Sequence, residues 1–339
     1  MAQIRENTDF WRNRAVLVTG AGGFIGSHLC ERLVLEGAKV RALIHYDARA
    51  HRSNLEYADP ELVRQMEVMA GDICDPFFVN RALSGQDTVF HLAALIAIPY
   101  SYRAPQSYLR VNVEGSLNIA EACMRNAVRR LVHTSTSETY GTARYVPIDE
   151  AHPLKGQSPY SASKIAADKV VESYVCSFSL PVVTLRPFNT YGPRQSARAV
   201  IPTIISQCLD KSQKAIKLGD LRPVRDLNFV LNTVDAYLAV AQAEGCLGET
   251  LNCGSGEGIS IRDLARLVME VTQVRKDVLE ESERLRPENS EVFQLVASAE
   301  RLRELTGWNP RIGLKEGLQR TVEFVGAHPE LYRPDEYTV

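Results

Sequence analysis

A glycine-rich turn near the start of the chain constrains the fold more than any other feature. The segment Val18–Ser27 reads VTGAGGFIGS and separates an apolar run from a helical pattern. In a phosphate-binding turn, the first glycine allows the turn, the second lets the backbone approach a pyrophosphate, and the third lets the helix pack on the strand. The N-terminus of the helix then faces the anion. We therefore expect a dinucleotide cofactor to be bound by Gly20, Gly23, Phe24, Ile25 and Gly26.

Short β-branched runs alternate with helical patterns through the first two-thirds of the chain. These patterns predict strands at residues 15–19, 39–44, 66–70, 88–92, 130–134 and 181–185. They predict long helices at residues 27–36, 108–126 and 161–178. Such alternation is typical of βαβ units, whose right-handed crossovers build a doubly wound parallel sheet. The predicted fold class is therefore α/β, with a Rossmann sheet.

The elements become shorter after Arg186, where prolines are frequent. The patterns there predict a strand at 249–253 and helices at 232–243, 261–272, 297–306 and 314–324. We interpret this change as a smaller C-terminal lobe at the carboxyl edge of the sheet, where open α/β sheets bind ligands. The expected division is a cofactor-binding domain at 1–187 and 227–256, and a substrate-binding lobe at 188–226 and 257–339.

The composition excludes several classes of function. The 339 residues include 39 basic and 41 acidic side chains, so a net charge of −2 provides no overall field for nucleic acid or an anionic membrane. No apolar run reaches the roughly 18 residues of a membrane-spanning helix, and the polar N-terminus has no signal-peptide core. The seven cysteines are scattered without a CxxC pair. We expect reduced thiols in a cytoplasmic enzyme, with no disulfide framework and no metal site.

Two acidic residues are candidates for selecting the cofactor. An acid at the end of the second strand would bind the ribose of NAD, and Asp47 is the first acid after that strand. No adjacent pair of basic residues follows directly to hold the 2′-phosphate of NADP, although Arg49 and Arg52 are near. Asp72, after the third strand, would either hydrogen-bond the adenine or simply close a turn. We therefore expect NAD rather than NADP.

Hydroxyl and carboxylate groups gather after the fifth predicted strand. The segment Thr134–Glu138 reads TSTSE and should face a ligand, because it follows the carboxyl end of a strand. Farther along, Tyr160 and Lys164 lie four residues apart and share one face of a predicted helix. A nearby ammonium group should lower the pKa of Tyr160, which could then remove a hydroxyl proton while a hydride leaves the same carbon. The alternative is an ordinary pair on a helix surface.

Taken together, these motifs resemble the extended short-chain dehydrogenase/reductases that act on nucleotide sugars. The resemblance is carried by the glycine turn, the Tyr/Lys pair, and the segments His91–Ala94 and Arg186–Pro193. Within that family, Ser135–Glu138 followed by Tyr-Gly is similar to the sugar 4,6-dehydratases. The similarity is greatest to the GDP-mannose type and, through Ala93–Tyr102, to the 4,6-dehydratases of nonulosonic (legionaminic-type) acid pathways. UDP-glucuronate decarboxylases also carry Ser-Thr-Ser-Glu, whereas 4-epimerases usually lack the glutamate.

The resemblance implies a catalytic role for each polar residue of the site. Tyr160 would take the proton of the sugar O4 hydroxyl, and Lys164 would hold the nicotinamide ribose. Thr136 would hydrogen-bond O4, and Glu138 would remove the C5 proton that a ketone at C4 acidifies. Ser137 stands where some relatives have an aspartic acid for the leaving hydroxyl, so either Glu138 makes both proton transfers or a water relays one. The product would be a 4-keto-6-deoxy sugar.

The resemblance also implies further contacts. Additional cofactor contacts would come from Ile73, Leu92, Ala93, Ala94 and Asn112. The substrate diphosphate would be bound by Asn189, Arg225 and Arg286, with Arg194 and Arg198 as further candidates. Arginine suits this task because its planar guanidinium donates two hydrogen bonds at once. The predicted helices 108–126 and 161–178 carry apolar residues on more than one face, so we expect a homodimer with a four-helix interface.

Other functions stay open from the sequence. A UDP-glucuronate decarboxylase or a nucleotide-sugar 4-epimerase would use the same C4 ketone. The decarboxylase needs a cation for the C6 carboxylate, and the sequence assigns none. A regulator that senses dinucleotides without turnover is the alternative outside enzymes, and the intact Tyr160, Lys164 and Glu138 argue against it. The nucleotide base and the substituent at C2 of the sugar are left open.

Overall fold

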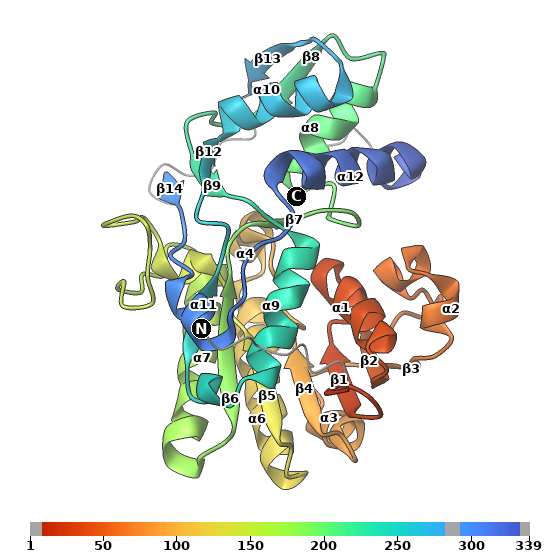
Figure 1. The fold of residues 1–339 in the computed structure, drawn as a ribbon, viewed down its shortest axis with the longest axis vertical. Helices are drawn as coiled ribbons and strands as arrows, with labels where there is room; N and C mark the ends of the chain where they lie inside the picture. Colours follow the sequence, from red (N-terminus) through yellow and green to blue (C-terminus); the bar gives the residue numbers. More distant parts are fainter. Residues whose placement is uncertain (1–8, 282–291, 333–339) are drawn as a thin grey trace.

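The large sheet of the protein has seven parallel strands. A computed structural model describes residues 9–281 and 292–332 (Figure 1). The strands follow the order β11-β6-β5-β4-β1-β2-β3, and every neighbouring pair is parallel. They are β1 (Ala15–Thr19), β2 (Lys39–His45), β3 (Glu67–Gly71), β4 (Thr88–His91), β5 (Arg130–Thr134), β6 (Val182–Pro187) and β11 (Thr250–Cys253). The predicted Rossmann sheet is confirmed, and its order reverses between β1 and β4.

Helices cover both faces of this sheet, and an apolar core lies under each layer. One layer contains α1 (Phe24–Leu35), α9 (Val230–Gln242) and α11 (Glu300–Thr306). The other contains α3 (Pro76–Leu83), α6 (Gly115–Arg125) and α7 (Pro159–Phe178). The short α2 (Pro60–Val63) packs beside α1. Two-sided cover explains why the strands read as continuous apolar runs.

Two helices beside the predicted site differ from their expected bounds. The helix expected at 108–126 is a run made of α5 (Pro105–Tyr108), a π-helical segment (Leu109–Glu114) and α6. Asn112 lies in this π-helical segment, and its side chain is buried. α7 begins earlier than expected because Ser158 caps it: the Ser158 hydroxyl accepts from the Ser161 amide at 3.1 Å, and the Ser161 hydroxyl accepts from the Ser158 amide at 3.0 Å.

A smaller lobe lies at one end of the large sheet (Figure 1). Its three small sheets pair β7 with β10, β9 with both β12 and β14, and β13 with β8. Its strands are β7 (Thr190–Tyr191), β8 (Ala215–Leu218), β9 (Val224–Asp226), β10 (Asn228–Phe229), β12 (Gly258–Ser260), β13 (Asp277–Glu280) and β14 (Gln294–Leu295). Its helices α8 (Val200–Leu209), α10 (Ile261–Thr272) and α12 (Leu314–Ala327) share one apolar core. The remaining helix, α4 (Ile98–Arg103), contacts α7.

The segment around α11 departs from the proposed domain division. Residues 257–339 were expected to belong to the substrate lobe, yet Ala299, Leu302 and Trp308 are buried in the core of the large sheet. The reason is that α11 covers the edge strand β11. The rest of the division stays a proposal. Among the described residues, no helix has the length and apolarity needed to span a bilayer.

Candidate functional site

The glycine turn has no room for side chains. Gly20 has a φ of +69°, and a Cβ there would lie 2.8 Å from the backbone nitrogen of Ala93. A Cβ on Gly26 would lie 2.2 Å from the backbone oxygen of Gly20. Gly23 is the N-cap of α1 and has no capping side chain, so the first amides of the helix are left for an external acceptor. This close-packed turn fits a dinucleotide pyrophosphate, with Phe24 and Ile25 in the first turn of α1.

The loop after β4 is fixed against this turn. The Thr19 hydroxyl accepts hydrogen bonds from the amides of Leu92 and Ala93, both at 3.1 Å. Asn112 holds the same loop farther along, because its side chain accepts from the Leu95 amide at 2.8 Å and donates to the Leu95 oxygen at 3.0 Å. Asn112 was expected to contact the cofactor, but its amide is used within the protein. The structure makes it a residue that positions the loop.

The two candidate acids lie at the same end of neighbouring strands. Asp47 is exposed, two residues after β2, and accepts from the Arg49 amide at 2.8 Å. Asp72 is exposed directly after β3 and accepts from the Cys74 amide at 2.9 Å. Ile73 is buried, so its side chain faces the core. Both carboxylates are therefore available at the edge where the glycine turn lies.

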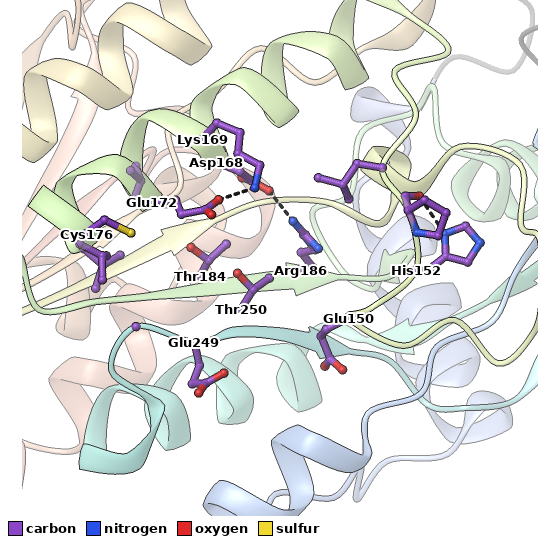
Figure 2. A pocket seen from close by; sticks show the side chains of 16 residues that line it. Glu150, His152, Asp168, Lys169, Glu172, Cys176, Thr184, Arg186, Glu249 and Thr250 are labelled. Atoms are coloured by element: carbon purple, nitrogen blue, oxygen red, sulfur yellow. Dashed lines mark hydrogen bonds and ion pairs between the residues drawn. The ribbon is translucent and has the colours of Figure 1, made fainter.

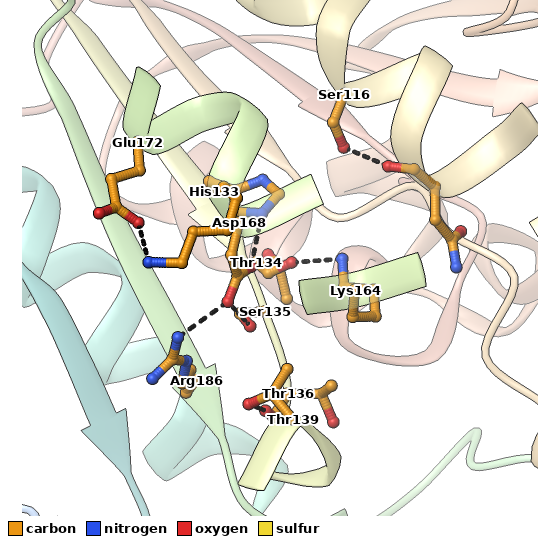
Figure 3. A network of polar contacts seen from close by, with 12 residues as sticks. Ser116, His133, Thr134, Ser135, Thr136, Thr139, Lys164, Asp168, Glu172 and Arg186 are labelled. Carbon is orange, nitrogen blue, oxygen red and sulfur yellow. Dashed lines mark hydrogen bonds and ion pairs between the residues drawn. The ribbon is translucent and has the colours of Figure 1, made fainter. Parts of the chain in front are cut away.

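The structure brings Tyr160, Lys164 and Thr136 together. Tyr160 and Lys164 lie one turn apart on α7, and both side chains are buried. Tyr160 shares a hydrogen bond with the side chain of Thr136, the residue that caps the short 3-10 helix Ser137–Tyr140. The Lys164 ammonium donates to the backbone oxygen of Thr134 at 2.7 Å (Figure 3). The end of β5 thus meets α7 at these three side chains.

The expected direction of the Tyr160 pKa is wrong. Burial raises this pKa, the hydrogen bond with Thr136 opposes the rise, and the charge of Glu138 adds to it. The Lys164 ammonium is bonded to the Thr134 carbonyl instead of the phenol. Burial lowers the pKa of Lys164 to about 8, against the opposing charge of Asp168.

Ser137 and Glu138 differ in their access to a ligand. Ser137 is buried, whereas Glu138 is half-buried and donates its amide to the Thr136 hydroxyl at 3.3 Å. The Glu138 carboxylate is close enough to Tyr160 to raise its pKa. Thr139 closes the turn by donating to the Thr136 oxygen at 2.8 Å. The arrangement gives a carboxylate base beside a phenol, which can act on neighbouring positions of one substrate.

The residues expected to bind the diphosphate come from separate segments of the smaller lobe. Asn189 donates to the Asp226 oxygen at 3.2 Å, and Arg225 is buried in β9, where it donates to the Val224 oxygen at 3.1 Å. Arg198 is exposed, and its charge lowers the pKa of Tyr108 against the effect of burial. Arg286 lies outside the described residues.

Arg194 is anchored to α1, and its contact with substrate stays a prediction. Its guanidinium pairs with Glu31 at 2.7 Å and donates to the Ser27 hydroxyl at 3.2 Å. Both partners lie on α1, so Arg194 ties the loop after β7 to the helix that begins at the glycine turn. The Nε2–H of His28 donates to the Pro193 oxygen at 3.0 Å, which adds a second contact between α1 and this loop.

A buried polar network behind Lys164 was missed by the sequence analysis. Asp168 accepts from His133 at 3.1 Å, from the Ser135 hydroxyl at 2.6 Å and from Arg186 at 3.0 Å (Figure 3). Burial favours the neutral acid, but the hydrogen bond from His133 and the nearby positive charges lower the pKa of Asp168 to about 2. The available signal was its position four residues after Lys164, on the same helical face.

A cavity of about 460 Å³ lies between α7, β6, β11 and the loop at residues 150–154 (Figure 2). Asp168 and Arg186 are among its lining residues, together with the exposed Lys169 and Glu172. Thr136, Glu138, Tyr160 and Lys164 are not among them. This cavity is therefore separate from the expected reaction site.

Comparisons with known proteins place this site in a family. A model of the family described as GDP-mannose 4,6 dehydratase matches residues 17–321. The chain is 33% identical over 312 residues to a UDP-glucose 4-epimerase of Mycolicibacterium smegmatis, covering 91% of this chain and 97% of the relative. It is 32% identical over 322 residues to the dTDP-D-glucose 4,6-dehydratase of Mus musculus, covering 92% of this chain and 88% of the relative.

The structural similarity extends over almost the whole chain. DesIV from Streptomyces venezuelae, a dTDP-glucose 4,6-dehydratase solved with NAD and TYD bound, superimposes with a TM-score of 0.82 at 27% identity. The match covers 94% of this chain and 99% of that one. The chain belongs to the GDP-mannose 4,6-dehydratase family.

Proposed function

We propose that the protein is an NAD-dependent nucleotide-sugar 4,6-dehydratase. The proposal is carried by one observation: Glu138, a half-buried carboxylate, lies beside the buried pair of Thr136 and Tyr160. A 4,6-elimination needs a base for the C5 proton in addition to a base for the O4 proton. The site offers both, and the glycine turn fits the pyrophosphate of the cofactor that DesIV binds.

The chain's own residues divide the proton chemistry. Tyr160 removes the O4 proton while Thr136 holds that oxygen by a hydrogen bond. Lys164 binds the nicotinamide ribose and, as an ammonium ion, favours the phenolate. NAD, when bound, would supply the hydride acceptor for oxidation at C4 and the hydride donor for reduction at C6. Glu138 removes the C5 proton, which the C4 ketone makes acidic.

The leaving hydroxyl at C6 needs a proton. Ser137 is buried and is a weak acid, so we assign this second proton transfer to Glu138. After accepting the C5 proton, the protonated carboxyl group of Glu138 can give a proton to the C6 hydroxyl. A base that becomes the acid of the next step avoids the need for a second carboxylate.

In the second lobe, Arg225 and Asn189 are proposed to bind the diphosphate, with Arg198 as a further contact. Asn189 and Arg225 lie close together, because Asn189 donates to Asp226, the residue after Arg225. We propose the same role for Arg286. We also propose that residues 188–226 and most of residues 257–339 form the substrate lobe.

A 4-epimerase is the second candidate, because a UDP-glucose 4-epimerase is as similar in sequence as the dehydratase. It would use Tyr160 and the C4 ketone without Glu138 as a base. A UDP-glucuronate decarboxylase is the third candidate.

One assay separates these functions. The purified protein is incubated with UDP-glucose, dTDP-glucose, GDP-mannose, UDP-N-acetylglucosamine and UDP-glucuronate. The masses of the products are then measured by mass spectrometry. A dehydratase removes the mass of one water. A decarboxylase removes the mass of carbon dioxide from UDP-glucuronate, and an epimerase changes no mass but gives a chromatographically distinct isomer. Either of the last two results would overturn the proposal.

A further inference from the structure

We propose that Asp168 is a positioning residue for C4 oxidation: its carboxylate fixes the segment after β5, and the ammonium group of Lys164, relative to Tyr160. This inference rests on the proposed roles of Tyr160 and Lys164. Asp168 itself is buried in the interior, at 5% exposure, and is not assigned a contact with substrate.

Both oxygens of the Asp168 carboxylate are used, and they join three elements of the fold. Oδ1 binds His133 on β5 at 3.1 Å. Oδ2 accepts from the Ser135 hydroxyl at 2.6 Å and from Arg186 on β6 at 3.0 Å. Charge-assisted hydrogen bonds of this kind are stronger than neutral ones and orient their partners. The carboxylate on α7 therefore sets the distance between that helix and the ends of two strands.

Ser135 is the link between this carboxylate and the reaction site. It lies between Thr134, whose oxygen accepts from Lys164 at 2.7 Å, and Thr136, whose side chain is hydrogen-bonded with Tyr160. Residues 134–136, at the end of β5 and directly after it, thus contact the α7 side chains of Lys164, Asp168 and Tyr160. If the Ser135 bond were lost, both Thr134 and Thr136 could move away from the helix that carries Tyr160 and Lys164.

Arg186 keeps the carboxylate in place from the other side. It donates to the Tyr140 hydroxyl at 3.0 Å, and Tyr140 donates in turn to Asn252 at 2.7 Å (Figure 3 shows the Arg186–Asp168 pair). Tyr140 ends the short 3-10 helix that contains Glu138. The network therefore supports the Glu138 turn at both its ends.

Asp168 also supplies the negative charge that opposes the burial of Lys164. The other charged or titratable groups around this lysine and aspartate are His91 on β4, His133 on β5, Arg186 on β6, and Tyr160 on the same helix. Burial lowers the pKa of both histidines and so favours their neutral forms, and Arg186 is a cation, so none of the three replaces the negative charge of Asp168. Without the aspartate charge, Lys164 should lose its proton at a lower pH.

The test compares three variants of the full-length protein. Asp168→Asn removes the charge but keeps the size of the side chain. Ser135→Ala removes one hydrogen bond and leaves the charge in place. Glu172→Gln is the matched control, because Glu172 is an exposed acid one turn farther along α7 whose partner is Lys169 at 2.5 Å.

The first measurement is the rate of cofactor reduction as a function of pH, after addition of a nucleotide sugar that the wild-type enzyme converts. At high pH the rate should fall as Lys164 loses its proton, and we call this fall the alkaline limb of the pH profile. In Asp168→Asn we expect the alkaline limb to shift to a pH lower by about one to three units. Ser135→Ala should turn over more slowly with the limb unmoved, and Glu172→Gln should match wild type. A merely structural role of Asp168 would lower stability without moving this limb.

The second measurement needs neither cofactor nor substrate. Amide hydrogen exchange of the segment 135–140 should become about tenfold faster in Asp168→Asn and in Ser135→Ala, and stay unchanged in Glu172→Gln. Wild-type exchange and a wild-type pH limb in Asp168→Asn would overturn the proposal. If Asp168→Asn does not fold, Ser135→Ala decides: wild-type exchange and turnover in that variant overturn it equally.

The results of these two measurements on Asp168 do not depend on which product the enzyme makes. If the enzyme were an epimerase, the mass assay would refute the dehydratase, while the shifted limb of Asp168→Asn would still be observed, because C4 oxidation precedes both reactions.

Discussion

Lys164 donates a 2.7 Å hydrogen bond to the backbone oxygen of Thr134, so the ammonium group of the expected catalytic pair is bound to the end of β5. This hydrogen bond and the negative charge of Asp168 stabilise the ammonium form of the buried lysine. They do not offset the full cost of removing the ammonium group from water, since burial lowers its pKa to about 8. This buried lysine is therefore held at a cost in stability.

That cost gives a pH-dependent prediction. The folded-state pKa of Lys164 is about 8, below its ordinary value of 10.5, so the folded state binds this proton less tightly than the unfolded state. The free energy of unfolding should rise by about 3 kcal/mol between these two pH values, because the cost of burying the charged amine is fully present below pH 8 and is relieved as Lys164 loses its proton. Lys164→Met has no such titration. The free energy of unfolding of wild type, measured relative to Lys164→Met, should increase over this pH range, and a constant difference would contradict the lowered pKa.

Substitution in the glycine turn should remove the cofactor. In Gly26→Ala the new Cβ would lie 2.2 Å from the Gly20 oxygen, so the turn must open and the first amides of α1 must shift. We expect protein purified without added cofactor to lose its bound NAD, measured by chromatography after denaturation. Gly313→Ala is the control, because a Cβ there meets no atom within 4 Å. Equal NAD content in both variants would contradict the assignment of this turn.

The homodimer is also open to a direct test. Leu109 and Leu117 lie eight residues apart along the run from the π segment into α6, and their exposed fractions are 52% and 37%. Apolar side chains at this spacing share a helix face, which a four-helix interface would cover. Leu117→Glu should shift the protein from dimer to monomer in sedimentation at micromolar concentration. Phe77→Glu on α3, at a side chain with 86% exposure, should stay dimeric. A monomeric wild type would overturn the prediction.

Features that depend on local spacing could be predicted from the sequence. The glycine turn, the sheet strands and the one-turn spacing of Tyr160 and Lys164 follow from short-range patterns. Helix α8 was missed although its polar residues Thr203, Ser206 and Gln207 recur at the i, i+3, i+4 spacing of one helix face. The capping serine of α7, Ser158, was overlooked, so that helix was predicted to start too late.

Features that depend on burial or on distant partners could not be predicted. The Tyr160 pKa moves in the opposite direction to the expectation, because spacing along a helix does not reveal how deeply the phenol is buried. Arg194 was expected to bind phosphate, but its guanidinium meets Glu31, which lies 163 positions earlier in the chain. Asn112 uses its amide on a loop that only the fold brings near it. Each of these outcomes is set by tertiary contacts.

Loss of the Tyr160 hydroxyl should stop the first chemical step. Tyr160→Phe keeps the ring that packs against Tyr108, with centroids 6.2 Å apart, and removes the proton acceptor for O4. Turnover should fall about 100-fold or more, and no reduced cofactor should accumulate. Circular dichroism and the melting temperature serve as controls for folding. Near-normal activity would show that another group takes the O4 proton.

Glu138→Gln should separate the two halves of the reaction. The amide keeps the shape of the half-buried side chain but cannot accept the C5 proton, while Thr136, Tyr160 and Lys164 are untouched. Adding substrate should therefore produce the near-ultraviolet absorbance of reduced nicotinamide, with little dehydrated product. Hydrogen exchange of the Gln variant with wild type as control will show whether the turn is intact.

Solvent deuterium gives an independent measure of the same step. The hydride that returns to C6 obliges a proton from solvent to enter at C5, so wild-type enzyme in deuterated water should label the product at C5. In Glu138→Gln this label should be lost together with the product, because no carboxylate exchanges the C5 proton. Normal turnover of the variant would exclude Glu138 as the base. A wild-type product without deuterium at C5 would count against the dehydratase itself, since no elimination across C5 and C6 could then have occurred.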